Sequence, residues 1–264
     1  MACAAVAHAG QKPLWEFGMG IGALGFADYR GSDVSHAYAI PVPYFVYRGK
    51  ILKADRDGIR GLLFNERYAT LNISINATTP VKSRSSGVRQ GMPDLKPTVE
   101  LGPSLDLHLW RSSDERLKLD FRMPLRAAFT IESSPRAIGW LFSPRFALDI
   151  PDAGGHPGLN LGILTGPLFA DRRYHEYFYS VAPQFATAQR PSYSASGGYS
   201  GFEGLVALSK RFPGYWIGAY ARYDTLAGAV FDASPLVRRN SYWSAGIGIA
   251  WMIGKSSRLV DAED

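Results

Sequence analysis

Apolar and polar side chains alternate along much of this chain with a period of two residues. In residues 241–253, Trp243, Ile247 and Trp251 share one face with other apolar residues, while the opposite face carries mostly small residues. The two tryptophans are eight residues apart, a rise of about 26 Å at ~3.3 Å per residue. In a strand tilted by roughly 40°, that rise spans about 20 Å, close to the ~25 Å apolar band and aromatic girdles of an outer-membrane barrel.

Residues 214–224 repeat this design, because Tyr215 and Tyr223 again stand eight residues apart on the more apolar face. The pattern predicts four membrane-interface aromatics, namely Tyr215, Tyr223, Trp243 and Trp251. Alternation of the same kind runs through residues 68–78, 99–109, 117–131 and 138–150.

Alternation alone does not separate a soluble β-sandwich from a membrane barrel, since each has one apolar and one polar face per strand. Three features favour the barrel. The strands are about 11 to 15 residues long, against about 5 to 6 in soluble proteins, and aromatic residues lie at strand ends. The polar faces combine small residues with charges of both signs, as a crowded lumen requires. We therefore predict an all-β fold, a closed antiparallel transmembrane β-barrel of about twelve strands.

The expected strands leave short and long connections on opposite sides of the membrane. Their ranges are about 14–24, 36–48, 50–64, 67–78, 97–110, 116–130, 138–150, 158–170, 174–187, 199–210, 214–225 and 241–253. With the N-terminus in the periplasm, the longer connections fall mostly outside the cell, and the long connection 79–96 is an exception on the inner side. Prolines within several strands, such as Pro144 and Pro167, predict bulges or pauses in the pairing.

Composition and the chain ends indicate where in the cell the protein is located. The net charge of +6 is scattered, so no nucleic-acid footprint is expected, and no stretch of about 18 apolar residues predicts a membrane helix. Ala7-His8-Ala9 fits a signal-peptidase site, which predicts a signal-peptide remnant over 1–9, a barrel over 10–253 and a polar C-terminal tail over 254–264.

The polar faces supply the candidate functional residues. Those predicted to face the lumen are Glu100, Asp106, His108, Lys118, Asp120, Arg122, Arg126, Arg145, Arg222 and Asp224. Unpaired buried charges are costly, so we expect opposite charges to pair and rigidify the lumen, with a narrow polar passage as the alternative.

Three motifs that resemble catalytic or binding sequences lack the context that their chemistry needs. Residues 20–25 match G-x-G-x-x-G but no helix is expected after them, and His175-Glu176 lacks the second histidine of a zinc site and reads as part of a strand. No G-x-S-x-G elbow is present, and His108 is expected to be a hydrogen-bond partner in the lumen. The basic run from Lys82 to Arg89 predicts a solvated face. We therefore expect no catalytic residues, no metal and no cofactor.

Several motifs, taken in order, resemble a known family. They include Asp28-Tyr29-Arg30-Gly31-Ser32-Asp33, Pro41-x-Pro43-Tyr44, Gly91-Met92-Pro93-Asp94, Gly166-Pro167-Leu168-Phe169-Ala170-Asp171 and Arg222-Tyr223-Asp224-Thr225-Leu226. Together they are similar to the MipA/OmpV family of outer-membrane proteins from Gram-negative bacteria, over residues 14–253. The chain departs from the usual aromatic end of the last strand, because a polar tail follows Ile253.

This resemblance implies an outer-membrane protein that contacts lipid and binds a lytic murein transglycosylase and a murein synthase as a scaffold. It implies no catalytic residue, because the family has none established. The alternatives are a narrow small-solute channel and a lipid-modifying barrel enzyme.

Overall fold

Antiparallel pairing joins each strand of the described sheet to its neighbours. The computed structural model describes residues 11–48, 52–55, 58–65, 68–113 and 117–261. Its strands are β1 (Gln11–Pro13), β2 (Trp15–Ala27), β3 (Ser35–Arg48), β4 (Leu52–Asp55), β5 (Gly58–Asn65), β6 (Ala69–Thr78), β7 (Thr98–Arg111), β8 (Lys118–Thr130), β9 (Ala137–Phe142), β10 (Arg145–Ile150), β11 (Leu159–Ala170), β12 (Gly198–Arg211), β13 (Tyr215–Thr225), β14 (Ser241–Lys255) and β15 (Leu259–Asp261). Its helix is α1 (Arg172–Tyr179), and 3-10 turns span Ser83–Ser85, Gly87–Arg89, Ala153–Gly155 and Pro183–Phe185.

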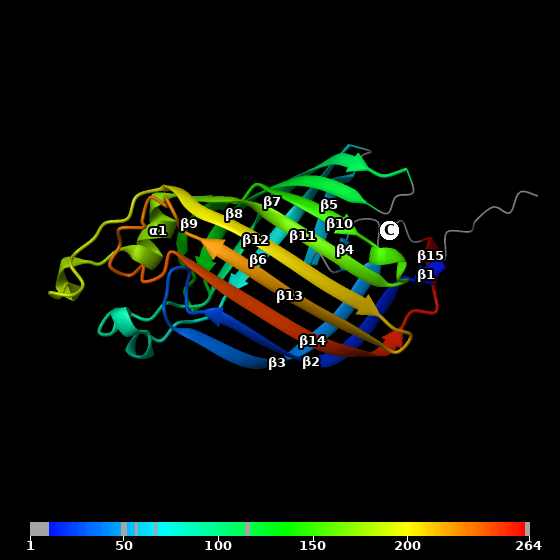
Figure 1. Cartoon of the computed structure of the whole chain (residues 1–264), viewed down its shortest axis with the longest axis horizontal. Coiled ribbons are helices and arrows are strands. Elements are labelled where there is room, and N and C mark those ends of the chain that lie inside the picture. Colours follow the sequence, from blue (N-terminus) through cyan, green and yellow to red (C-terminus); the bar gives the residue numbers. More distant parts are fainter. Residues whose placement is uncertain (1–10, 49–51, 56–57, 66–67, 114–116, 262–264) are drawn as a thin grey trace, which may run out of the picture.

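The strand pairings close into a ring (Figure 1). Consecutive strands pair from β2 to β8 and from β11 to β14, and β14 returns to pair with β2. Both β9 and β10 pair with β8 on one side and with β11 on the other, so they are two halves of one interrupted strand. The thirteen strands of the described sheet therefore occupy twelve positions, and the predicted all-β barrel is confirmed.

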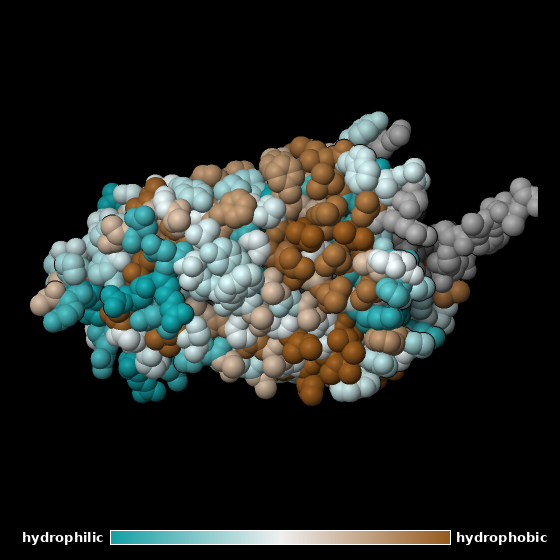
Figure 2. Space-filling view, in the orientation of Figure 1, coloured by the Kyte–Doolittle hydropathy of each residue, from teal (hydrophilic) through white to brown (hydrophobic). Residues whose placement is uncertain are grey.

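The outer surface is the apolar one. Large apolar side chains such as Ile21, Ile247 and Trp243 are 65%, 61% and 68% exposed. Figure 2 shows hydrophobic residues gathered in a belt across the wall, with hydrophilic residues beyond it on the loop side. A belt of this kind fits a wall that faces lipid, since soluble monomers rarely expose apolar patches above a few hundred Å².

The two ends of the barrel differ. We call one the turn end, because the connections 151–158 and 212–214 lie there together with the β1–β15 pair. The other is the loop end, formed by residues 28–34, 79–97, 131–136, 171–197 and 226–240. Among the described residues, no helix is long and apolar enough to cross a membrane. The expected signal remnant over 1–9 lies outside the described residues, and residues 259–261 of the expected tail pair with β1.

Two errors in the expected strands cancel in the count. The expected strand over 50–64 is two strands, β4 and β5. The expected strand over 174–187 is wrong, because helix α1 and a 3-10 turn occupy that range. The side chain of Asp171 caps α1 by accepting a hydrogen bond from the backbone N–H of Tyr174.

The additional strand also moves the connection 79–97. Each strand reverses the chain direction, so splitting 50–64 into two strands places the end of β6 at the loop end. Val81 and Leu95 pack there in a buried cluster with Tyr29 of the loop that follows β2. The expectation of a long connection on the inner side is therefore wrong. The three longest connections described, 79–97, 171–197 and 226–240, all lie at the loop end.

Prolines mark real irregularities in the wall. Pro144 lies between β9 and β10, where the strand is interrupted. The register of β11 against β12 shifts between Pro167 and Phe169. Proline offers no backbone N–H to a neighbour, which accounts for both breaks.

Candidate functional site

Charged residues follow one row of neighbouring positions across the inner wall. The register places Asp106 of β7 opposite Arg122 of β8, and Arg122 opposite Arg145 of β10. Further round, Glu203 of β12 lies opposite Asp224 of β13. The predicted alternation on each strand thus becomes, after closure, a belt of charge inside the barrel.

Glu100 and Arg126 form the most enclosed ion pair. Their side chains are 1% and 6% exposed, and Nε of Arg126 lies 3.2 Å from Oε2 of Glu100. Asn76 donates to the same carboxylate at 3.0 Å. Arg126 donates further hydrogen bonds to the hydroxyls of Ser74 and Ser143. Buried ions persist only when paired and hydrogen-bonded, and this pair meets both conditions.

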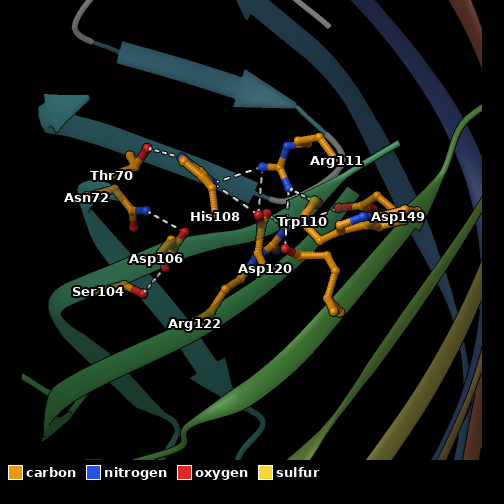
Figure 3. Close-up of polar contacts among 11 residues, drawn as sticks. Thr70, Asn72, Ser104, Asp106, His108, Trp110, Arg111, Asp120, Arg122 and Asp149 are labelled. Carbon is orange, nitrogen blue, oxygen red and sulfur yellow. Dashed lines mark hydrogen bonds and ion pairs between the residues drawn. The ribbon is translucent and has the colours of Figure 1, made fainter. Parts of the chain in front are cut away.

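A second cluster surrounds Asp106 (Figure 3). Asn72 donates to its Oδ2 at 2.8 Å, and the hydroxyl of Ser104 donates to its Oδ1 at 2.7 Å. Asn72 is on the neighbouring strand β6, and Ser104 is on β7 with Asp106 itself. The carboxylate therefore receives its hydrogen bonds from side chains of the barrel wall.

A third cluster joins His108 to Asp120 (Figure 3). Nδ1 of His108 lies 3.0 Å from Oδ1 of Asp120, and its Nε2 lies 3.0 Å from the hydroxyl of Thr70. Arg111 donates to Oδ1 of Asp120 at 2.7 Å. A histidine held on both ring nitrogens by a threonine and a carboxylate is an element of a structural network.

Arg122 and Lys118 extend this cluster towards β10. Arg122 lies 3.2 Å from Asp149 and 3.6 Å from Asp120. Lys118 is half-buried and stands opposite Asp149 in the register of β8 and β10. The charges of these neighbouring side chains alternate in sign, as pairing of lumen charges requires.

The fourth cluster is centred on Asp224, which is fully buried. Nε of Arg222 donates to its Oδ2 at 2.8 Å, and Nε of Arg30 donates to its Oδ1 at 3.0 Å. Arg30 comes from the loop after β2 and also donates to the backbone carbonyl of Ser200. Alternation along strands could not indicate Arg30, because it lies outside any strand.

Arg145 is the least matched of these arginines. The described carboxylate nearest to it belongs to Glu203, at 3.7 Å, and its Nε has no hydrogen-bond partner. Glu203 was not among the predicted lumen residues. The pattern on β12 could have indicated it, because Phe202 and Val206 share one face of the strand and Glu203 lies on the other.

The four expected interface aromatics form two cross-strand pairs. Tyr223 stands opposite Trp243, with ring centroids 5.0 Å apart, and Tyr215 stands opposite Trp251. Trp243, Trp251 and Tyr223 are exposed on the outer wall, and Tyr215 is half-buried.

Helix α1 and the loops close the loop end. Tyr179 stacks on Phe231, with ring centroids 3.7 Å apart, and donates a hydrogen bond to the carbonyl of Arg30. Nε2 of His175 lies 2.6 Å from the hydroxyl of Ser200. The hydroxyl of Tyr174 donates to Glu100 at 2.8 Å, so the cap reaches into the lumen. Burial beside that carboxylate raises the pKa of Tyr174 well above its usual value.

The basic run in the connection 79–97 is only partly solvated. Lys82 and Arg84 are exposed, but Arg89 is 3% exposed and donates to the carbonyls of Phe178 and Pro93. The expectation of a solvated face is therefore wrong for Arg89, whose charge satisfies carbonyls that α1 and its neighbouring loop leave open.

The turn end is filled by a different set of side chains. The indole of Trp216 occupies the inner space beside Gly218, and its ring lies 6.2 Å from that of Tyr44. Arg211 pairs with Glu16 and donates to the hydroxyl of Tyr44 at 2.9 Å. Small residues on β2 and β14 leave room for these large ones.

A cavity of about 500 Å³ remains between the two ends. Its lining includes Glu100, Asp106, Arg122, Arg126, Arg145, Glu203 and Arg222. Apolar side chains line it as well, namely Leu24, Phe26, Leu141, Leu168 and Leu205. Leu141 stands opposite Arg126 and Leu205 opposite Arg222 in the register, so charged and apolar side chains alternate along much of the lining.

In comparisons with known proteins, the chain is similar to outer-membrane proteins. The family model described as MltA-interacting protein MipA matches residues 19–253. Outer membrane protein Omp26La of Vibrio anguillarum and outer membrane protein OmpV of Vibrio cholerae are each 24% identical over 238 residues, which covers 88% of this chain and 84% of theirs. A solved outer-membrane channel of Pseudomonas putida F1 is 11% identical, with a TM-score of 0.45, covering 96% of this chain and 100% of that one.

Proposed function

The chain belongs to the MipA family of outer-membrane proteins, and from this premise we propose that it is a binding protein rather than an open pore. In the proposal it acts as a scaffold, holding a lytic murein transglycosylase and a murein synthase at the inner face of the outer membrane. The family description names an MltA-interacting protein, and this supports a murein-degrading partner.

The observation that carries the proposal is the closure of the lumen at both ends. Arg211, Tyr44 and Trp216 occupy the turn end, while α1 covers the loop end and is bonded to Glu100. A barrel built in this way presents surfaces to partners but offers little room for flow.

The turn end is the surface we assign to the partners. Outer-membrane barrels have short periplasmic turns and longer external loops, so the turn end faces the periplasm. Murein and its enzymes are on that side. The β1–β15 pair also projects there and offers strand edges to a partner.

The test is a pull-down from crosslinked membranes with the tagged barrel. We expect a lytic murein transglycosylase and a murein synthase to co-purify, and a variant truncated after Lys255 to lose them while its mobility still shifts on heating. Recovery of folded barrel with neither enzyme, in repeated experiments, would refute the scaffold.

The charged cavity favours a narrow small-solute channel as a second candidate. Planar bilayers distinguish the two. A scaffold whose lumen is closed at both ends gives no stepwise current, whereas reproducible steps would favour the channel.

A further inference from the structure

The wall of the barrel is incomplete on one side. Strand β3 pairs with β4 only at Tyr47 and Arg48, and β6 pairs with β5 only from Thr70 to Asn72. Among the described residues, 35–46 of β3 and 73–78 of β6 therefore have no strand partner on the sides that face each other. The short β4–β5 hairpin covers only the part of the wall nearer the turn end (Figure 1).

The sequence of β3 suits an unpaired edge. Pro41 and Pro43 cannot donate to a neighbouring strand, and proline within sheets is confined to edges, first residues and bulges. Residues 35–41 are all exposed, whichever way they point. Tyr38 and Ile40, on the inner face, are 39% and 38% exposed, which indicates an opening rather than a sealed seam.

The cavity of about 500 Å³ reaches this opening. Its lining includes Ile73 and Ile75 of the free β6 segment, and Leu24 and Phe26 of β2, the strand beside β3. Phe26 in turn stacks on Tyr38 of β3, with ring centroids 5.2 Å apart. The route from the side of the barrel into the lumen is thus bordered by apolar side chains of β2 and β3 and by alternating apolar and polar side chains of β6. Cavities of roughly 300 to 1,000 Å³ are the usual size for small-molecule sites.

One arginine of the cavity wall is more weakly paired than the others. Of the five that line the cavity, Arg30, Arg122, Arg126 and Arg222 each lie within 3.2 Å of a carboxylate, whereas Arg145 does not. Arg145 stands next to Arg122 in the register, so a like charge is its neighbour. The carboxylate of Glu203 is 3.7 Å away, and Nε of Arg145 has no hydrogen-bond partner. The Arg145 side chain is partly buried at 25% exposure, and a guanidinium with an open donor is suited to bind a carboxylate or phosphate.

We propose that this cavity binds a single-chain amphiphile with an anionic headgroup, such as a fatty acid, which comes from the membrane through the gap between β3 and β6. The headgroup pairs with Arg145, and the acyl chain lies along Leu24, Phe26 and the edge of β6. The loop end and the turn end are filled, so the gap is the route that remains. This site is independent of the scaffold proposal.

The test uses the full chain in phosphatidylcholine vesicles, with a photoactivatable diazirine analogue of palmitate as the probe. Labelled peptides are mapped by mass spectrometry. We expect saturable labelling on residues 35–46 and 73–78, which palmitate competes away and which hexadecanol and inorganic phosphate do not. Arg145→Gln should weaken binding about tenfold, as expected for the loss of a charge-assisted hydrogen bond, whereas Arg145→Lys should retain most of it.

A matched control is Arg136→Gln, because Arg136 lies in a loop with its side chain 68% exposed and should leave binding unchanged. The heat-dependent gel shift establishes that each variant is folded. Unsaturable label spread over the outer belt would overturn the proposal, and so would equal binding by the Gln and Lys variants of Arg145. Competition by phosphate at the concentration effective for palmitate would also overturn it, since the site would then recognise an anion without its chain.

Discussion

The hydroxyl of Tyr174 lies 2.8 Å from Oε1 of Glu100, and this contact joins the helix of the loop end to the barrel wall. Glu100 also pairs with Arg126, so the cap and the lumen form one polar network. A change at either end of this network is expected to affect the other, because a carboxylate that is 1% exposed depends on its protein partners for hydrogen bonds.

Glu100→Gln should destabilise the barrel strongly. It leaves the guanidinium of Arg126 buried without its counter-charge, a loss of about 3 to 5 kcal/mol in the free energy of unfolding. Urea unfolding in lipid vesicles, followed by tryptophan fluorescence, measures it. Glu132→Gln is the control, because its partner Arg136 is on the surface and little change is expected. Similar urea midpoints for Glu100→Gln and Glu132→Gln would contradict the claim that the Glu100–Arg126 pair is needed for stability.

A charge introduced on the outer wall should destabilise the barrel by an amount that depends on its depth in the bilayer. Ile247 is at the middle of β14 on the outer face and Ser241 is at its end. Ile247→Arg should cost about 2 to 4 kcal/mol and Ser241→Arg about 0 to 1, because a lipid-facing charge is most costly at the midplane of the bilayer. Unfolding from vesicles compares them. Equal costs would mean that this face does not contact lipid.

Gly139 should be required for the cap. Its φ of +129° is one that L side chains rarely adopt, and a Cβ there would lie 2.2 Å from Oδ1 of Asp171 and 2.5 Å from the backbone nitrogen of Tyr174. Gly139→Ala should displace the N-terminus of α1 and increase protease cleavage in the connection 171–197. Gly214→Ala has nothing within 4 Å of the added Cβ and serves as the control. Undiminished protection in the Gly139 variant would contradict this role.

The cap should loosen on acidification. Burial lowers the pKa of His175 below its ordinary 6.5, with Arg30 acting in the same direction and Asp171 and the Ser196 carbonyl opposing. The unfolded chain then binds the proton more readily, so the contribution of neutral His175 is complete above about pH 6.5 and falls as the pH drops below that value. Hydrogen exchange of α1 between about pH 5 and 8 measures this effect. His175→Asn should remove the dependence, and an unchanged profile in that variant would assign it to other groups.

Much of the barrel could be predicted from alternation, because a strand with one face in lipid and one in the lumen must alternate. The segment 174–187 could not be predicted in this way. Aromatic residues there suggested a strand, but the Asp171 cap and packing on Phe231 favour a helix. Alternation also did not indicate that residues 50–64 form two strands, β4 and β5. Chain direction depends on each such turn, and so the side of the connection 79–97 was predicted wrongly.

The sequence by itself determined the fold class, the outer apolar face and which strand residues carry charge inward, because these follow from a period of two. Only the tertiary structure decided which charges meet, since partners such as Arg30 and Asp224 are 194 positions apart and come together when the ring closes. The same closure created the cap over the lumen and the gap beside β3. Both depend on contacts between distant segments, which no local pattern encodes.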